Sequence, residues 1–366
     1  MRKRRRWLRW LGYIALAGLI VVAIPFVVIE GACRPESAAS EAANATSFNI
    51  ADAGYRRNEA NTYFTFPEWY IVYSFEDFGR FLDHGSESGF KYSRHIAGFW
   101  RSFCTINRFA AGRYRNLSDV KTMIYVIGFS YSIEYAIKGA YENTIGRLFE
   151  WIRGPQPTPQ DQYARAVLQD YAAFLYTVPW YKYPFQDKLA GLRAITAPTA
   201  SPARTAERNF ALGTEYRIKV GYAALIQKAL DATSDDEPRE IMFVVRTLPA
   251  DLLAREPRIK VIRALTPEWQ LVLTPRYKDF TEIVKLLLQE GYPIAEIAGN
   301  RNILITAIAP DGPFPVIDSV RPLFSLALDA RPGFHRIGVG AKVDQLVPIA
   351  KALEAAGIGI EHFYDY

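Results

Sequence analysis

Three charged residues recur at intervals of four within GFSYSIEYAIKGAYENTIGRLFEW, residues 128–151. Glu134, Lys138 and Glu142 would lie on one stripe of a helix, because residues four apart are neighbours on its surface. The rest of this stripe is apolar or aromatic, which is unusual for a face that meets solvent. One interpretation is an internal network of Glu–Lys–Glu pairs. The other is a pocket in which Glu134 transfers protons, with its pKa set by burial and by Lys138.

Asp77 is a third candidate catalytic residue, because it lies among aromatic side chains. Residues 61–82 contain nine aromatic residues out of 22. If the segment is a helix, Asp77 falls inside its aromatic sector. An unpaired buried carboxylate is costly, so the pattern predicts a partner for Asp77.

The aromatic residues themselves allow two interpretations. A helix with so wide an apolar sector is either the central helix of a domain or a surface for a lipid or another apolar ligand. The residues predicted to contact such a ligand are Trp69, Tyr70, Tyr73, Phe99, Trp100 and Tyr131.

Basic residues dominate the next segment. No Asp or Glu occurs between Ser88 and Ser118, whereas acidic residues are frequent in residues 59–87. Two neighbouring helices of opposite charge would form ion pairs with each other. Alternatively, Arg94, Arg101 and Arg108 contact anionic lipid headgroups. A histidine in such a segment is more typical of a surface or a cap than of a ligand.

The N-terminal residues account for the net charge of the chain. Six of the 44 Lys and Arg side chains lie within residues 2–9, so the remaining 38 balance the 38 Asp and Glu side chains. The body therefore has no overall basic character, and we expect no nucleic-acid partner.

An uncharged apolar stretch, residues 11–29, follows these cations. A helix that crosses a bilayer needs about 20 apolar residues, and cations before it favour a cytoplasmic N-terminus. We therefore predict an uncleaved single-pass anchor in a bacterial inner membrane, with the bulk of the chain in the periplasm. A cleaved secretory signal is the alternative.

Cysteine and motif content exclude several classes of site. Outside the cytoplasm, Cys33 and Cys104 could form a disulfide, but two unpaired thiols are equally compatible with the sequence. Two cysteines and four scattered histidines provide no metal-binding framework. The chain has no phosphate-binding loop and no dinucleotide fingerprint. We therefore predict neither a metal site nor a cofactor.

The patterning predicts an α+β protein with four parts. These are residues 1–30 as basic flank and membrane anchor, 31–60 as linker, 61–232 as an aromatic-rich helical region, and 233–366 as an antiparallel sheet with helices. Residues 294–309 are predicted to form a hairpin that turns at Gly299-Asn300. No internal repeat is evident, although two strand–helix–strand units are loosely alike.

The final residues resemble a known type of module. Gly338-Val339-Gly340-Ala341, the helix through Leu353, and Gly357 to Glu361 resemble the closing half of an ACT-type, ferredoxin-like ligand-binding module. The resemblance implies a ferredoxin-like sheet. The turn Asp329 to Gly333 precedes a strand rather than following one, so no amino-acid site is carried over from the family.

These observations lead to three functional hypotheses. The first is an envelope protein that binds or scaffolds, held to the membrane by residues 11–29, with a lipid, a protein or a second copy as partner. The second is an enzyme or carrier that handles a lipid or other apolar substrate through Glu134, Lys138 and Asp77. The third is a sensor that binds a small molecule in its C-terminal region.

Overall fold

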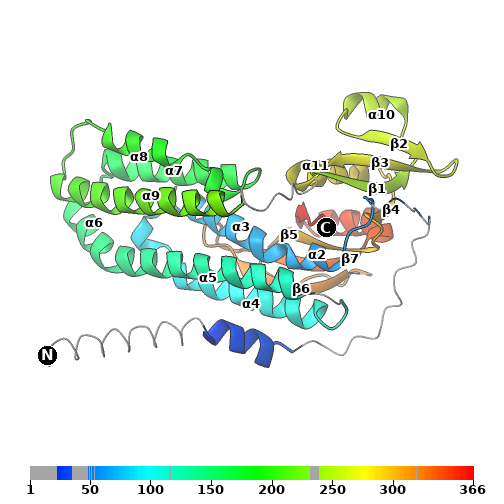
Figure 1. Cartoon of the computed structure of the whole chain (residues 1–366), viewed down its shortest axis with the longest axis horizontal. Coiled ribbons are helices and arrows are strands. Elements are labelled where there is room, and N and C mark those ends of the chain that lie inside the picture. Colours follow the sequence, from blue (N-terminus) through cyan, green and yellow to red (C-terminus); the bar gives the residue numbers. More distant parts are fainter. Residues whose placement is uncertain are drawn as a thin grey trace.

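The computed structural model describes residues 23–34, 48, 50, 52, 54–114, 117–230, 239–318 and 320–366, with the side chains of residues 229 and 230 left out. Helices fill the first half of the described chain and sheets the second (Figure 1). The helices are α2 (Ala60–Phe64), α3 (Phe66–Phe81), α4 (Tyr92–Ala110), α5 (Ser118–Tyr141), α6 (Arg147–Arg153), α7 (Pro159–Leu175), α8 (Phe185–Arg193) and α9 (Pro202–Leu230). Short turns interrupt them at η1 (Val28–Ala32), η2 (Glu87–Gly89), η3 (Glu142–Gly146) and η4 (Trp180–Lys182).

Local sequence explains where the main helices start and stop. Pro67 occupies the first turn of α3, where its missing N–H costs no hydrogen bond. Thr158 and Asp161 form a reciprocal capping box that begins α7. α5 continues through the π-helical turn η3 into α6, which ends at Gly154 with φ of 78°. A positive φ suits glycine, so the chain turns there.

The strands form two antiparallel four-stranded sheets rather than the one sheet expected from the sequence. Sheet A has the order β2-β3-β1-β4 and sheet B the order β6-β7-β5-β8. The strands are β1 (Glu240–Arg246), β2 (Lys260–Ala264), β3 (Trp269–Pro275), β4 (Ile294–Ile297), β5 (Asn302–Pro310), β6 (Val320–Ala327), β7 (Phe334–Lys342) and β8 (Gly359–Phe363). The accompanying helices are α10 (Ala250–Arg255), α11 (Tyr277–Gln289) and α12 (Leu346–Ala355), with the turn η5 (Val343–Gln345).

The two sheets share one connectivity. Sheet A follows the order strand–helix–strand–strand–helix–strand, which is the connectivity of ferredoxin-like units. Sheet B repeats it, with a loop after β5 in place of the first helix. The predicted hairpin over residues 294–309 is wrong, because β4 belongs to sheet A and β5 to sheet B. Ala298 and Gly299, with φ of 48° and 77°, carry the chain from one sheet to the other. The resemblance to ACT-type modules stays a prediction.

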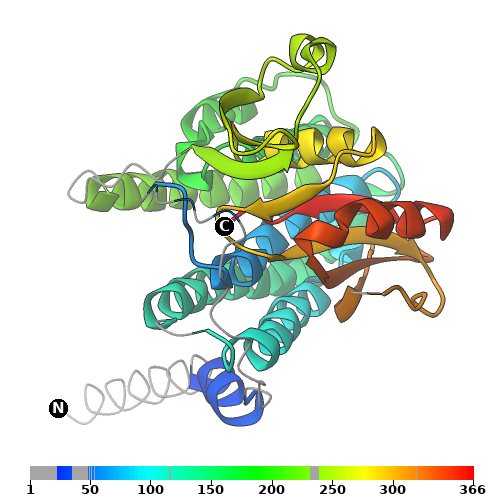
Figure 2. The same ribbon diagram turned by 90° about the vertical axis from the view of Figure 1, so that its right-hand side faces the viewer.

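Sheet B lies between the helical region and a second core. Ile303 and Ile305 of β5 face the core that α11 and α12 share with sheet A. Leu304 faces the opposite side and joins the aromatic core of α2 to α5. Because side chains alternate along a strand, one strand contributes to both cores. Figure 2 shows the strands of sheet B and the helices α2 and α3 in adjacent layers.

The membrane-spanning prediction for residues 11–29 is wrong where the structure describes this segment. Residues 23–27 are α-helical and run into η1. Ile29 is 1% exposed within the core, and Glu30 pairs with Lys121 of α5 at 2.5 Å. Residues 11–22 lie outside the described residues. Among those described, none of the helices has both the length and the apolar character needed to cross a bilayer. The membrane anchor and the single-pass inner-membrane localisation with a periplasmic body are therefore not retained.

The end of this segment is instead tied to the helical region. Cys33 forms a disulfide with Cys104 of α4, which resolves the alternatives left open by the sequence. Asn107 and Arg108 of α4 donate hydrogen bonds to the carbonyl oxygens of Cys33 and Ala32 at 2.9 and 3.1 Å. These contacts hold η1 against α4.

Candidate functional site

The charged stripe of α5 pairs with α9, not with itself. Glu134 lies 2.8 Å from Lys219, and Lys138 donates to Glu215 across 2.9 Å. Glu134 and Lys138 thus each pair with an α9 residue of opposite charge. Because the two helices are antiparallel, the α9 partner moves from residue 219 to residue 215 as the α5 residue moves from 134 to 138. The predicted internal Glu–Lys–Glu network is therefore replaced by rungs between two helices. We call these contacts the α5–α9 ladder.

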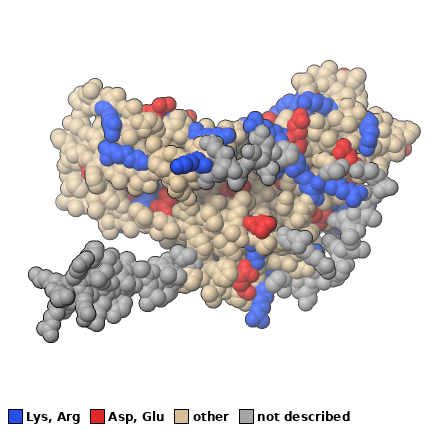
Figure 3. Space-filling view, in the orientation of Figure 1, with Lys and Arg blue, Asp and Glu red and all other residues tan. Residues whose placement is uncertain are grey.

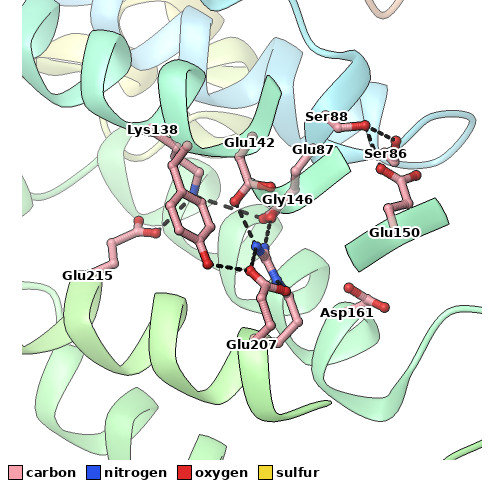
Figure 4. Close-up of polar contacts among 12 residues, drawn as sticks. Ser86, Glu87, Ser88, Lys138, Glu142, Gly146, Glu150, Asp161, Glu207 and Glu215 are labelled. Atoms are coloured by element: carbon pink, nitrogen blue, oxygen red, sulfur yellow. Dashed lines mark hydrogen bonds and ion pairs between the residues drawn. The ribbon is translucent and has the colours of Figure 1, made fainter. Parts of the chain in front are cut away.

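A third rung joins Glu142 to Arg208 at 3.0 Å, where the Arg208 guanidinium is fully buried. Arg208 also bonds Glu207 at 2.5 and 2.8 Å and the Glu87 carboxylate of η2. Lys138 lies 4.0 Å from that same Glu87. Figure 4 shows carboxylates from η2 (Glu87), η3 (Glu142) and α9 (Glu207 and Glu215) gathered near Lys138 of α5. Buried charges require such pairing, because removal from water is costly.

The π-helical turn η3 places Glu142 in this cluster. The carbonyl of Gly146 accepts a hydrogen bond from Arg204 at 3.1 Å, a bond that a wider helical turn permits. A Cβ at Gly146 would collide with the Glu142 carboxylate. A side chain at position 146 would therefore displace the Glu142 carboxylate from its place in the cluster.

Burial and neighbouring charges together raise the pKa values of both Glu142 and Lys138, which favours a neutral carboxyl and a charged ammonium. Burial raises the pKa of Glu142 to about 8; the Glu87 charge adds to this rise, and Arg208 opposes it. Burial alone would lower the pKa of Lys138, but the charges of Glu215 and Glu87 outweigh it and raise that pKa. Lys138 is therefore a permanent cation, and Glu142 gains or loses a proton near neutral pH.

A small pocket lies behind the ladder. Phe75, Lys138, Tyr171, Glu215 and Lys219 are among the residues that line it, whereas Glu134 and Asp77 are not. The Lys219 ammonium lies 4.7 Å from the Tyr171 ring centre and 5.3 Å from that of Phe75. Both lysines in the pocket also have carboxylate partners, because Lys138 pairs with Glu215 and Lys219 with Glu134. The three residues predicted as catalytic do not meet at one cavity.

Asp77 occupies a separate cluster beside the turn after β6. It accepts hydrogen bonds from the backbone N–H groups of Asp329 and Ala330 at 2.9 and 2.8 Å. His95 Nε2 lies 3.4 Å from Asp77 and 3.5 Å from Asp329. Asp77 thus has the partners that its burial required, and they join α3 to sheet B.

His95 is buried between two carboxylates rather than placed at the surface or a cap. Burial alone would lower its pKa, but hydrogen bonds to Asp329 and Asp77 outweigh that effect and raise the pKa. Its Nδ1 atom lies 2.9 Å from the hydroxyl of Ser74, which donates to Tyr135 at 3.1 Å. A protonated imidazole donates from both nitrogens, so His95 is a poor base toward Ser74.

This Ser–His–Asp series superficially resembles a hydrolytic triad. Ser74 is 2% exposed, however, and its oxygen also lies 2.6 Å from the Tyr131 hydroxyl. A nucleophile needs access to its substrate, and here the hydroxyl is enclosed by tyrosines. The cluster therefore connects helices rather than exposing a nucleophile.

The predicted apolar contacts are core residues. Trp69, Tyr70, Tyr73, Phe99 and Tyr131 are 0–7% exposed, and Trp100 is half-buried. Trp69 lies against the His362 ring of β8, with ring centres 4.0 Å apart. Their placement supports the interpretation of α3 as a central helix. A role in lipid binding stays a prediction that this packing does not favour.

The predicted headgroup cations Arg94, Arg101 and Arg108 are exposed and seven residues apart on α4, so they lie on one face of that helix. Their contact with anionic lipid headgroups stays a prediction. Arg94 pairs with Asp329, Arg108 bonds the Ala32 carbonyl, and Arg101 is exposed. The contacts of Arg94 and Arg108 are thus with other parts of the chain, rather than with the acidic residues of α3 that were expected as partners.

Sequence analysis missed the α9 partners and the His95 cluster. The α9 partners carried a usable signal, since Arg204 and Arg208, and likewise Glu215 and Lys219, are four residues apart. Ser74 and His95 carried none, because no short motif links them. In the described part of the chain, no group of His, Cys, Asp and Glu is arranged to hold a metal ion. No protein-family model, curated protein or solved structure matches this chain.

Proposed function

We propose that this chain is a binding or scaffolding protein that presents the outer faces of α5 and α9 to a protein partner. The observation that carries the proposal is a concentration of exposed apolar side chains on these helices. Val126, Ile133 and Ile137 of α5 are 59%, 52% and 67% exposed. Ile218 and Leu225 of α9 are 65% and 64% exposed. We call these five residues the outer α5–α9 surface.

The two faces meet at their border. The hydroxyls of Ser130 on α5 and Tyr222 on α9 lie 3.3 Å apart. Figure 3 shows broad areas without charged side chains over the helical region. An exposed apolar patch larger than a few hundred Å² is uncommon on a monomer and typical of an interaction site.

The paired charges beneath this surface also support a binding role. Glu134 and Lys138 hold α5 and α9 in a fixed relation, and Asp77 holds α3 to sheet B. A rigid support is what a docking surface needs, because ordering it on binding would cost free energy.

The experiment compares two substitutions on the surface with one away from it. Ile218→Glu and Leu225→Glu place charges on the outer face of α9, and Val316→Glu changes a fully exposed residue in the loop between β5 and β6. All three should keep the wild-type thermal midpoint, because surface substitutions usually change stability by less than about 0.5 kcal/mol. We expect the wild type to run in large assemblies on native gels of cell extracts. The α9 variants should lose both these assemblies and the ability to complement cells that lack the protein.

The proposal fails if the α9 variants assemble and complement as well as Val316→Glu does. It also fails if Glu134→Gln abolishes complementation at an unchanged thermal midpoint. That second result would favour an enzyme or carrier that works through Glu134.

A further inference from the structure

The outer face of α5 has the residue spacing of a helix–helix contact. Six positions alternate steps of four and three residues, which is the spacing that keeps one seam facing a partner helix. Five lie on α5 and the last in η3, and none is charged. The positions are Val126, Ser130, Ile133, Ile137, Ala140 and Thr144. We call them the α5 seam.

The surroundings of the seam are uncharged as well. Every exposed residue from Thr122 to Ile145 is uncharged, and the nearest charged residues outside this stretch are Lys121 and Arg147. Solvent-facing helix surfaces normally carry charges. Here Glu134 and Lys138 pair with α9 in the ladder, which fixes the rotation of α5 about its axis. The seam is therefore left exposed except at Ser130, which is half-buried beside Tyr222 of α9.

The seam is self-complementary in shape. Ile133 and Ile137 flank its midpoint, and the next positions outward are Ser130 and Ala140, which are both small. The outermost pair is Val126 and Thr144, whose side chains have nearly the same shape. In a two-fold antiparallel pair each residue faces its opposite number in the other copy. Side chains of matching size would therefore meet at every step.

The exposed apolar area extends beyond the seam. Eight large apolar residues of α5, η3 and α6 are 46–79% exposed. Val126, Ile133 and Ile137 belong to the seam, and a standard interface takes about 800 Å² from each partner, so a dimer would also cover apolar residues of η3 and α6. The eight residues are Met123, Val126, Ile133, Ile137, Ile145, Leu148, Trp151 and Ile152.

From these observations we infer that the partner at α5 is a second copy of this chain, packed with its own α5 antiparallel across the seam. This inference rests on the proposed function and names one partner of the outer α5–α9 surface. The α9 residues of that surface remain outside the contact and available to another protein.

Sedimentation velocity on the purified full chain tests the inference between about 1 and 100 µM. The wild type should pass from monomer to dimer in this range. Ile137→Glu should weaken the dimer at least about 30-fold, because it places a charge at the centre of a buried contact. Val316→Glu, which places the same charge on the loop between β5 and β6, is the control and should dimerise as the wild type does. A wild type that stays monomeric throughout, or an Ile137→Glu variant that dimerises normally, would overturn the inference.

Cysteine cross-linking tests the antiparallel register. Both native cysteines are joined in a disulfide, so introduced cysteines are the free thiols. The double variant Ser130→Cys with Ala140→Cys should form a covalent dimer on mild oxidation, because the two positions face each other. Ser130→Cys alone should not. Efficient linkage through the single variant would mean a parallel pair and would reject the proposed arrangement.

The two proposals fail in different ways. If the purified chain is monomeric but Ile137→Glu still disrupts assemblies in cells, the second copy is rejected and the binding surface stands. If the chain dimerises through the seam but the α9 variants assemble and complement normally, the wider binding role is rejected and the dimer stands.

Discussion

Glu134 of α5 and Lys219 of α9 form an ion pair across 2.8 Å, and the next pair along, Lys138 with Glu215, has the opposite polarity. The third pair, Glu142 with Arg208, restores the first polarity. Because the charges alternate in sign along both helices, each charge meets one of opposite sign in one register only. A slip of one rung would bring like charges together, so the ladder fixes how α5 lies on α9.

Removing one member of a rung should be costly. In Lys138→Met, Glu215 loses its nearest cation, although Lys219 remains 3.8 Å away, and Glu87 loses a neighbouring positive charge. We therefore expect a loss of about 3 kcal/mol in the free energy of unfolding. Glu215→Gln added to Lys138→Met should recover part of that loss. A double-mutant cycle in urea measures the coupling, and additive effects would show that this rung contributes little.

Glu142 should make stability depend on pH. Its pKa is raised to about 8 in the folded protein from 4.5, so the folded state holds this proton more tightly than the unfolded chain. The resulting stabilisation is fully present below about pH 4.5 and is lost as the pH rises toward 8. The Glu142→Gln variant has no carboxyl group at this position, so its folded state does not lose stability in this way as the pH rises. Its stability relative to the wild type should therefore improve by about 1–3 kcal/mol between roughly pH 5 and pH 8.

Glu207→Gln is the control for that measurement, since Glu207 bonds the same guanidinium. Burial would raise the pKa of Glu207, but Arg208 outweighs burial and lowers it. Its stabilisation is thus present above about pH 4.5 and lost only as the pH falls through the lowered pKa. Glu207→Gln should be destabilised by a constant amount between about pH 5 and pH 8. A parallel trend in the two variants would count against the assignment of Glu142.

The disulfide should stabilise the folded chain. Cys33 and Cys104 are 71 residues apart, and closing a loop of that length restricts the unfolded chain by about 4 kcal/mol in the chain-entropy model. Cys104→Ser should lower the thermal midpoint, and a reductant should lower that of the wild type but not of the variant. A non-reduced peptide map that shows two free thiols would contradict the pairing.

Two glycines of β7 should respond differently to alanine. A Cβ at Gly338 would collide with the Phe324 ring of β6, whereas the nearest atom to one at Gly340 is 3.7 Å away. We expect Gly338→Ala to cost about 1–3 kcal/mol through overpacking and Gly340→Ala to be nearly neutral. Thermal melts of both variants compare them directly, and equal costs would argue against the close approach of Phe324.

Periodic and capped segments could be predicted from the sequence, since their signals are local. The aromatic segment over 61–82, treated as a helix in the sequence, contains α3, Phe66–Phe81. The helical stripe of Glu134, Lys138 and Glu142 lies on α5 and the turn η3 that continues it. Strand β6 was missed because Pro322 and polar residues disturb its alternation. The chain tolerates that proline because β6 is an edge strand.

Long-range partners could not be predicted in the same way. The sequence showed that Asp77 needed a partner, but backbone N–H groups at residues 329 and 330 carry no residue-type signal. The charged residues of α5 were interpreted as pairing with one another, because their α9 partners are more than 60 residues away in the sequence. The contact between two distant helices was decided by tertiary packing.

A charge exchange across the first rung tests most directly whether these buried charges support a binding surface. Glu134→Lys combined with Lys219→Glu keeps the ion pair but removes the carboxylate from position 134. We predict that each single variant has a lower thermal midpoint and that the double variant recovers it and complements cells that lack the protein. A double variant that is as stable as the wild type yet fails to complement would contradict this prediction. It would show that function requires the carboxylate at position 134, as in an enzyme or carrier.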